Sequence, residues 1–300
     1  MKGRLQHIGF AGRICLFLLV MLLTTAVAIG LWAMMTGGSQ TVESLKLMQM
    51  LQTVGTFMLP CFICAALWSE EPIRWLSLNR GIDWKESLLT IVLMLCASPF
   101  INLLAYLNEQ LVLPDFLSGL EQLMRQQEEA AAALTEKFIR ADSIGVLLFN
   151  IVLMALLPAF SEEICFRGVL QRLFADIKHN RSAESGKQLP HIAIWVTAII
   201  FSAIHFQFYG FIPRMLIGAL LGYMLCLSGS LWLPVLAHFT NNATAVILYN
   251  IYYMRGNNPD EIDSFGTGDT LWVGIVSAVL TIGLTYLLLC MLKKRNEEVG

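Results

Sequence analysis

Long, nearly uninterrupted runs of apolar residues restrict what this chain can fold into. A bilayer core about 30 Å thick is crossed by roughly 20 apolar residues in a helix. Eight segments approach or exceed that length, near residues 12–35, 45–68, 86–110, 143–175, 191–207, 209–228, 231–252 and 270–292. The sequence therefore predicts an all-α fold, a polytopic transmembrane bundle of about eight helices.

Composition excludes a water-soluble domain. Of the 300 residues, 56% are hydrophobic and 14% are charged, whereas soluble chains carry about 25% charged residues. A soluble fold of this size would lack the polar side chains needed to cover its surface. Cys61 and Cys64 form a C-x-x-C, but inside an apolar helix beside Pro60. Without a thioredoxin-like context, buried small residues are the favoured interpretation. No nucleic-acid motif or phosphate loop is present.

The basic residues are distributed unevenly between the two sides of the predicted bundle. Eight spans place both termini on one side, and most lysines and arginines fall there: Lys2, Arg4, Arg13, Arg74, Arg80, Lys85, Arg172, Lys178, Arg181, Lys187, Lys293, Lys294 and Arg295. Because cytoplasmic loops are enriched in such residues, we predict a multi-pass protein of the cell membrane with both termini in the cytoplasm.

The chain divides into three parts. Residues 1–142 hold the first spans and a connecting helix, residues 143–250 hold the polar clusters described below, and residues 251–300 hold a loop and the last span. The connection LEQLMRQQEEAAAALTEKFIRA favours helix by composition and is amphipathic enough to lie on a membrane surface. It is either a lid or substrate-docking helix or a plain surface connection, and we favour the plain connection.

The first polar cluster follows the apolar run 144–160. Residues with ionisable side chains are costly inside a membrane and are functional candidates by default. Glu163 and Arg167 are spaced i, i+4, which suits an ion pair on one helix face. Glu162 then has no partner in its own helix and is available as a general base. The alternative is a solvated helix end carrying both glutamates.

Two further clusters lie downstream. His205 falls in an apolar run with Phe201, and His238 and Asn242 share a helix face at i, i+4. Each signal is weak alone, because asparagine also holds membrane helices together. A glutamate, two histidines and an asparagine converging in one bundle supply a base, orienting groups and oxyanion donors. Those are the parts needed to attack an amide with water.

These three clusters resemble the motifs of the CAAX protease and bacteriocin-processing family of intramembrane peptidases, often grouped as Rce1-like or Abi proteins. The family motifs E-E-x-x-x-R, F-x-x-x-H and H-x-x-x-N read here as Glu162-Glu163…Arg167, Phe201…His205 and His238…Asn242, in family order. The resemblance covers about residues 143–250, which would be the Rce1-like catalytic core.

The resemblance implies a role for each residue. Glu162 would activate water, and His205 would help to hold that water. Glu163 would pair with Arg167 and position Glu162, while His238 and Asn242 would stabilise the oxyanion. The catalytic set is therefore Glu162, Glu163, Arg167, His205, His238 and Asn242.

Metal chemistry is the alternative to a glutamate mechanism. Glu162, His205 and His238 also form a zinc ligand set of the metalloprotease kind. The chain lacks H-E-x-x-H, and the two histidines lie on different predicted helices, so spacing does not decide. We favour a metal-free glutamate mechanism with no cofactor, which the resemblance also implies, and keep zinc as the alternative.

The sequence thus predicts a membrane-embedded endopeptidase whose partners are membrane lipid and a peptide or protein substrate that reaches the bilayer. Eukaryotic members of the resembled family trim three residues after a prenylated cysteine, and many bacterial members mature peptides or support bacteriocin immunity. No feature of this sequence chooses between them or gives an oligomeric state. The competing hypothesis is a transporter or a non-catalytic membrane adaptor, although no inverted repeat or pair of broken helices supports it.

Overall fold

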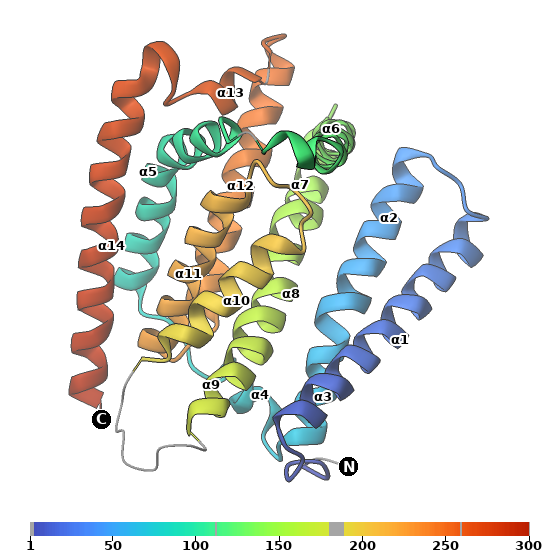
Figure 1. Cartoon of the computed structure of the whole chain (residues 1–300), viewed down its shortest axis with the longest axis vertical. Helices are drawn as coiled ribbons and strands as arrows, with labels where there is room; N and C mark the ends of the chain where they lie inside the picture. The colour runs from blue at the N-terminus through green and yellow to red at the C-terminus, as the bar shows by residue number, and fades with distance from the viewer. Residues whose placement is uncertain (1–2, 112, 180–188, 259, 300) are drawn as a thin grey trace.

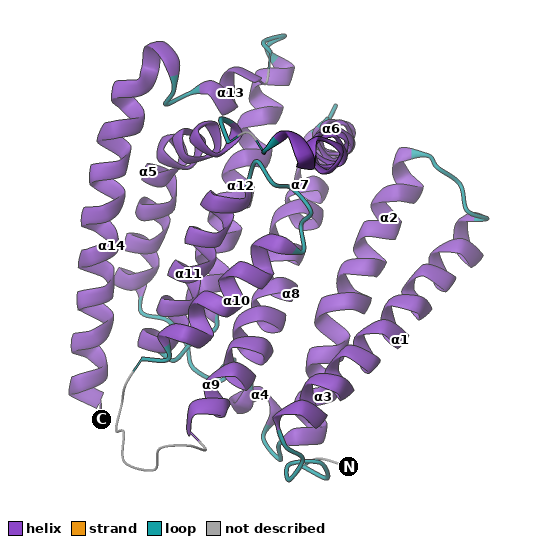
Figure 2. Cartoon of the chain, viewed as in Figure 1, coloured by secondary structure: helices purple, strands orange, loops and turns teal. Residues whose placement is uncertain are grey.

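A computed structural model of the chain describes residues 3–111, 113–179, 189–258 and 260–299. These residues form helices and connecting loops without a β-strand, which confirms the predicted all-α class (Figure 2). The basic residues Arg181 and Lys187 lie outside the described residues. In Figure 1, α1 begins and α14 ends at the same end of the bundle, as an even number of crossings requires.

The helices follow one another with short connections. The first half of the chain holds α1 (Phe10–Thr36), α2 (Val42–Thr53), η1 (Val54–Met58), α3 (Leu59–Trp68), α4 (Pro72–Trp75), α5 (Trp84–Glu109), η2 (Asp115–Leu117) and α6 (Ser118–Ile139). The second half holds α7 (Ile144–Ile151), η3 (Val152–Leu156), α8 (Leu157–Glu163), η4 (Ile164–Leu170), α9 (Gln171–His179), α10 (His191–Ala203), α11 (Phe211–Ser228), α12 (Trp232–Met254), α13 (Asp260–Ser264), η5 (Gly268–Thr270) and α14 (Leu271–Val299).

Among the described residues, six helical segments are long and apolar enough to cross a membrane. They are Phe10–Thr36, Val42–Trp68, Trp84–Glu109, Ile144–Asp176, Phe211–Ser228 and Gly268–Arg295. Of the other two predicted spans, α12 is 23 residues long but carries the polar cluster around His238, and α10 has only 13 residues. The predicted span 191–207 therefore ends earlier than expected, at Ala203.

Two of the long helices contain a wide π-helical turn directly before a proline. The turn η1 precedes Pro60 and η3 precedes Pro158. A proline inside a helix has no N–H to donate, and its ring clashes with the carbonyl four residues back. A widened turn keeps the helix continuous around that clash, so Pro158 leaves the span Ile144–Asp176 unbroken ahead of the two glutamates.

Gly218 and Gly222 of α11 form a G-x-x-x-G that packs within the bundle. A Cβ on Gly218 would lie 3.2 Å from both the Arg167 and Phe201 side chains, and one on Gly222 would lie 2.7 Å from Gln171. Small residues let membrane helices approach closely. Here they bring the backbone of α11 against η4 and α10, which carry or adjoin the polar clusters.

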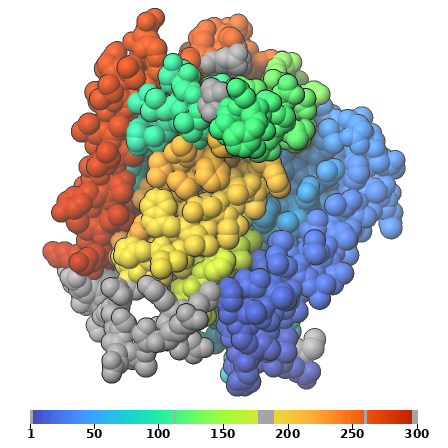
Figure 3. All heavy atoms as spheres, viewed as in Figure 1, coloured from blue at the N-terminus to red at the C-terminus, as the bar shows by residue number. Residues whose placement is uncertain are grey.

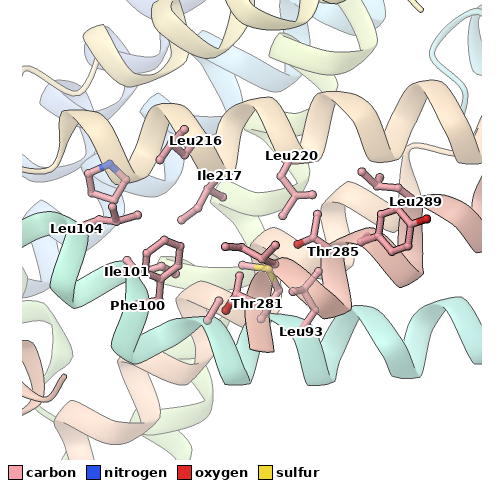
Figure 4. A pocket seen from close by; sticks show the side chains of 15 residues that line it. Leu93, Phe100, Ile101, Leu104, Leu216, Ile217, Leu220, Thr281, Thr285 and Leu289 are labelled. Carbon is pink, nitrogen blue, oxygen red and sulfur yellow. The ribbon is translucent and has the colours of Figure 1, made fainter. Parts of the chain in front are cut away.

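An apolar groove of about 480 Å³ lies between α5, α11 and α14 (Figure 4). Its walls are formed mostly by apolar side chains, among them Leu93, Ile101, Leu216 and Leu289. The hydroxyl-bearing residues Thr281 and Thr285 also line it. It contains none of the predicted catalytic residues. This groove and the polar clusters are therefore separate features.

The amphipathic helix α6 lies across one end of the bundle (Figure 1). Its last turn is held by buried amides, because Asn150 and Asn250 both donate to the Ile139 carbonyl, at 3.0 and 3.1 Å. The buried Lys46 ammonium donates to Asn150 Oδ1 at 2.7 Å. These side chains satisfy a carbonyl that the helix itself leaves without a partner, and they fix the C-terminal end of α6.

Candidate active site

The two glutamates lie inside a transmembrane helix. Glu162 and Glu163 end α8, and the helical segment continues through η4 and α9. The Glu163 side chain is 0% exposed and that of Glu162 is 14% exposed. The alternative of a solvated helix end is therefore wrong for this pair.

Arg167 neutralises Glu163, as the i, i+4 spacing predicts. Its Nη1 lies 2.8 Å from Glu163 Oε1, and both side chains are fully buried. The Nη2 group donates to the Gly218 carbonyl at 3.0 Å, and the guanidinium carbon stands 4.5 Å from the centre of the Phe201 ring. Because an unpaired charge is very costly at this depth, these contacts fix the orientation of Glu163.

The His238 ring lies between Glu163 and Glu162. Its Nδ1 lies 2.8 Å from Glu163 Oε1, the same oxygen that accepts from Arg167. With an ionised Glu163, the Nδ1–H group is the donor, an assignment made from the hydrogen-bond network. The other ring nitrogen, Nε2, stands 3.9 Å from Glu162 Oε2. This distance exceeds a direct hydrogen bond, so Nε2 faces Glu162 without being bound to it.

His205 lies in the turn after α10. The sequence had predicted it inside the span 191–207. Ser202 donates its hydroxyl to the Phe211 carbonyl at 2.7 Å, which joins the end of α10 to the first residue of α11. The His205 Nδ1 atom is 2.7 Å from the Phe201 carbonyl oxygen. Its ring stands edge-on to the Phe201 ring at 5.1 Å, and the His238 ring packs against the same phenyl at 6.0 Å.

Both histidines contact Phe201, although His205 follows α10 and His238 lies on α12. In Figure 1, α10 crosses the bundle obliquely rather than parallel to its neighbours. A short, tilted helix delivers Phe201 and the following turn to the level of His238 on α12. The two imidazoles therefore border one phenyl ring.

Asn242 is placed less directly. It lies one turn after His238 on the same face of α12, is half-buried, and accepts from the Asn241 amide at 3.2 Å. Contacts thus join Glu162, Glu163, Arg167 and His238, and Phe201 adds His205. Asn242 is beside this group by helical periodicity alone.

Residues that sequence analysis missed support the turn that carries His205. The buried Asn108 of α5 donates to the Phe208 carbonyl at 2.9 Å and accepts from the Ile212 N–H at 2.8 Å. With Ser202, it fixes both ends of the segment between α10 and α11. The available signal was an amide at the end of an apolar run, but its partners lie about 100 residues away in sequence, and no local pattern reveals them.

The metal alternative finds no preformed site in the described part of the chain. Over residues 3–111, 113–179, 189–258 and 260–299, no three His, Cys, Asp or Glu side chains form a group that could hold a metal ion. Glu162, His205 and His238 do not form such a set in this conformation.

Comparison with known proteins supports the resemblance suggested by the motifs. Residues 144–244 match the family described as type II CAAX prenyl endopeptidase Rce1-like, close to the predicted core of residues 143–250. An uncharacterized protein of Bacillus subtilis (strain 168), YpbD, is 33% identical over 116 residues. That alignment covers 37% of this chain and spans about half, 52%, of the relative. No solved structure matches the chain.

Proposed function

We propose that this chain is an intramembrane endopeptidase in which Glu162 activates the attacking water, since residues 144–244 match the Rce1-like family. The observation that carries the proposal is the connected series Arg167, Glu163 and His238, which ends 3.9 Å from Glu162. One glutamate is neutralised and fixed, and the other faces an oriented imidazole. Such a division of two carboxylates is typical of acid–base catalysis.

The proposed reaction begins at Glu162. Its carboxylate takes a proton from a water molecule, and the resulting hydroxide attacks the carbonyl carbon of the peptide bond. The carbonyl oxygen becomes an oxyanion, the C–N bond breaks, and Glu162 returns the proton to the leaving amine. In this way the atoms and protons balance without a covalent enzyme intermediate.

The histidines and Asn242 assist this reaction. Glu163 holds His238 through Nδ1, so that the protonated ring donates from Nε2 to the oxyanion. Asn242, one turn further on α12, adds a second donor. His205, held by the Phe201 carbonyl, orients the water. In this division of labour Arg167 and Glu163 position other groups and do not touch substrate.

The proposed substrates are peptides or protein tails that reach the bilayer. A site built on membrane-spanning helices receives substrate from the membrane or its surface, so a lipid-attached or hydrophobic peptide fits it. Both the prenylated tails and the small peptides handled by the family meet this condition.

The decisive experiment compares membrane peptides from cells that make the wild-type protein with those from cells that make Glu162→Gln. Glutamine keeps the shape of the side chain and removes the base, which contributes about 10²–10⁴-fold in rate. Glu71→Gln, in an exposed ion pair with Arg74, is the matched control. We expect fragments from wild type and Glu71→Gln and none from Glu162→Gln, with equal amounts of folded protein in the membrane.

Chelation separates the two chemistries. Purified protein treated exhaustively with a chelator retains activity if Glu162 works without a metal. Loss of activity that zinc restores would assign Glu162, His205 and His238 to a metal site instead.

The absence of any peptide product, in wild type and all variants, would reject the peptidase. It would favour the transporter or adaptor hypothesis, in which the same polar residues carry protons or hold helices together.

A further inference from the structure

A second groove, of about 350 Å³, lies between α6 and the segment that carries His205. In Figure 3 the green atoms of α6 lie directly over the yellow atoms of α10, and this contact borders the groove. The walls are Leu120, Leu123, Met124 and Gln127 of α6, and Ser202, Ala203, Phe206, Gln207, Phe208 and Phe211 from the other side. The second wall includes the residues on both sides of His205.

The α6 wall is a single helix face. Leu120, Leu123, Met124 and Gln127 are spaced i, i+3, i+4 and i+7, so they share one side of the helix. Leu123 lines the groove and is nevertheless 58% exposed. This face of the amphipathic helix is therefore only partly covered by the rest of the protein.

The opposite wall contains a strained aromatic residue. Phe206 directly follows His205, has a φ of 53°, and is 76% exposed. Positive φ is uncommon for a bulky residue, and such strained conformations gather at functional sites. The protein thus holds a large apolar ring at the edge of the candidate active site at the expense of local stability.

Both walls are fixed before anything binds. Ser202 and Asn108 hold the ends of the segment that carries Phe206. The Arg125 guanidinium of α6 stands 4.8 Å from the centre of the Tyr209 ring, which keeps α6 against that segment. A preformed apolar pocket with a few polar groups is the usual form of a ligand site.

Building on the proposed function, we propose that this groove binds an apolar side chain of the peptide substrate next to the scissile bond, with Phe206 and Leu123 determining specificity. The wall contains Ala203 and Phe206, which lie on either side of His205 in the chain. An occupant of the groove therefore adjoins the reacting centre. The rim also carries the amides of Gln127 and Gln207, which suit a peptide backbone better than a lipid acyl chain.

The test uses internally quenched peptides and the full-length protein in phospholipid nanodiscs. The peptides vary one position at a time between Leu, Phe, Ala and Ser. At one peptide position we expect kcat/KM to be higher for Leu and Phe than for Ala and Ser. We expect Phe206→Asn and Leu123→Gln each to reduce this ratio about tenfold, within the range for a lost apolar contact. Asparagine tolerates positive φ, so Phe206→Asn removes the ring without adding strain.

The control is Leu134→Gln. Leu134 is 41% exposed, lies on the same face of α6 two turns beyond Gln127, and is not part of the groove. We expect its peptide preference to match wild type. A preference unchanged in Phe206→Asn and Leu123→Gln, or reduced equally in Leu134→Gln, would overturn the proposal.

A capture experiment separates this inference from the proposed function. A photoreactive benzoylphenylalanine in place of Leu123, in the Glu162→Gln background, should crosslink to a biotinylated Leu-containing peptide. Crosslinks to phospholipid alone would overturn the peptide groove. Peptide captured at Leu123, together with no cleavage of that peptide by the protein that keeps Glu162, would support the groove and reject the peptidase.

Discussion

A single oxygen, Glu163 Oε1, receives two hydrogen bonds in this structure, one from Arg167 and one from His238. Its second oxygen and Arg167 Nε have no partner among the described residues. The carboxylate is thus fully buried but not fully satisfied, and its orientation depends on two donors from different helices. Because each donor removes part of the cost of burying the charge, the pair is sensitive to the loss of either one.

Arg167→Ala leaves the Glu163 carboxylate buried with His238 alone. We expect this change to lower the free energy of unfolding by about 3–5 kcal/mol, the usual effect of removing one partner of a buried ion pair. Thermal unfolding in detergent micelles measures it. Arg74→Ala breaks the exposed pair with Glu71 and should leave the midpoint unchanged. Equal midpoints for both variants would show that Glu163 is neutral or hydrated in the native protein.

Asn242 and Asn241 provide a neighbouring pair for testing the oxyanion role. Removing one oxyanion donor typically costs about 2.7–4 kcal/mol of transition-state stabilisation. Asn242→Ala should therefore lower kcat about 10²–10³-fold on a quenched peptide, with little change in KM. Asn241→Ala removes the amide that Asn242 accepts from and should have a much smaller effect. A larger loss of kcat in Asn241→Ala than in Asn242→Ala would show that Asn241, and not Asn242, is the oxyanion donor.

At the residue level, the sequence predicted the contacts that helical geometry determines. The i, i+4 spacing gave the Glu163–Arg167 ion pair, which the structure contains. The bond between Glu163 and His238 joins residues 75 positions apart, and no local pattern contains it. The family motifs predicted that these residues share one site, but not which of them contact each other. The contacts of Arg167 with Glu163 and of Glu163 with His238 are seen in the structure.

At the scale of a helix, Pro99 shows how α5 remains continuous through a break in its hydrogen bonds. Ser277 of α14 accepts from the Phe100 N–H at 3.0 Å and donates to the Cys96 carbonyl at 2.5 Å. One hydroxyl therefore satisfies the N–H after the proline and the carbonyl four residues before that N–H. Neighbouring helices supply such contacts at prolines in membranes, where water is absent.

Ser277→Ala tests this contact. It removes the Ser277 partner of the Phe100 N–H and of the Cys96 carbonyl, which are partly buried. Because an unsatisfied polar group costs about 1–3 kcal/mol, we expect an unfolding free energy lower by about 1 kcal/mol. Thr281→Val, one turn along α14, replaces a buried hydroxyl without a partner among the described residues and should not destabilise. SDS titration of both variants in mixed micelles provides the comparison. Greater destabilisation by Thr281→Val would contradict the assignment.

At this scale the sequence predicted the positions of most helices but not their internal geometry. Apolar length located the six membrane-spanning segments, because the bilayer sets that length. It overestimated α10 by four residues, since apolar residues continue into the turn that carries His205. The π turns η1 and η3 precede prolines visible in the sequence, but η4 contains no proline. No proline directly follows η4 either, and its Gly168 lies closely against Leu76.

For the whole molecule, the arrangement of the ends constrains the orientation in the membrane. The helices α1 and α14 have their terminal ends together, and α6 lies at the opposite end of the bundle (Figure 1). The basic residues near the chain ends, among them Arg13 and Lys294, are therefore separated from α6 by the thickness of the bundle. Because cytoplasmic loops collect Lys and Arg, we expect α6 on the outer face, where the proposed peptide groove opens.

Cysteine labelling in intact cells tests this orientation. Glu129→Cys places a thiol on an exposed position of α6, and Lys294→Cys places one near the end of α14. A thiol reagent that does not cross membranes should label Glu129→Cys directly, but Lys294→Cys only after permeabilisation. The unsubstituted protein is the control, because its seven free cysteines lie in or beside apolar helices. The reverse pattern would invert the bundle, put the groove in the cytoplasm, and direct the search for substrates to cytoplasmic protein tails instead of exported peptides.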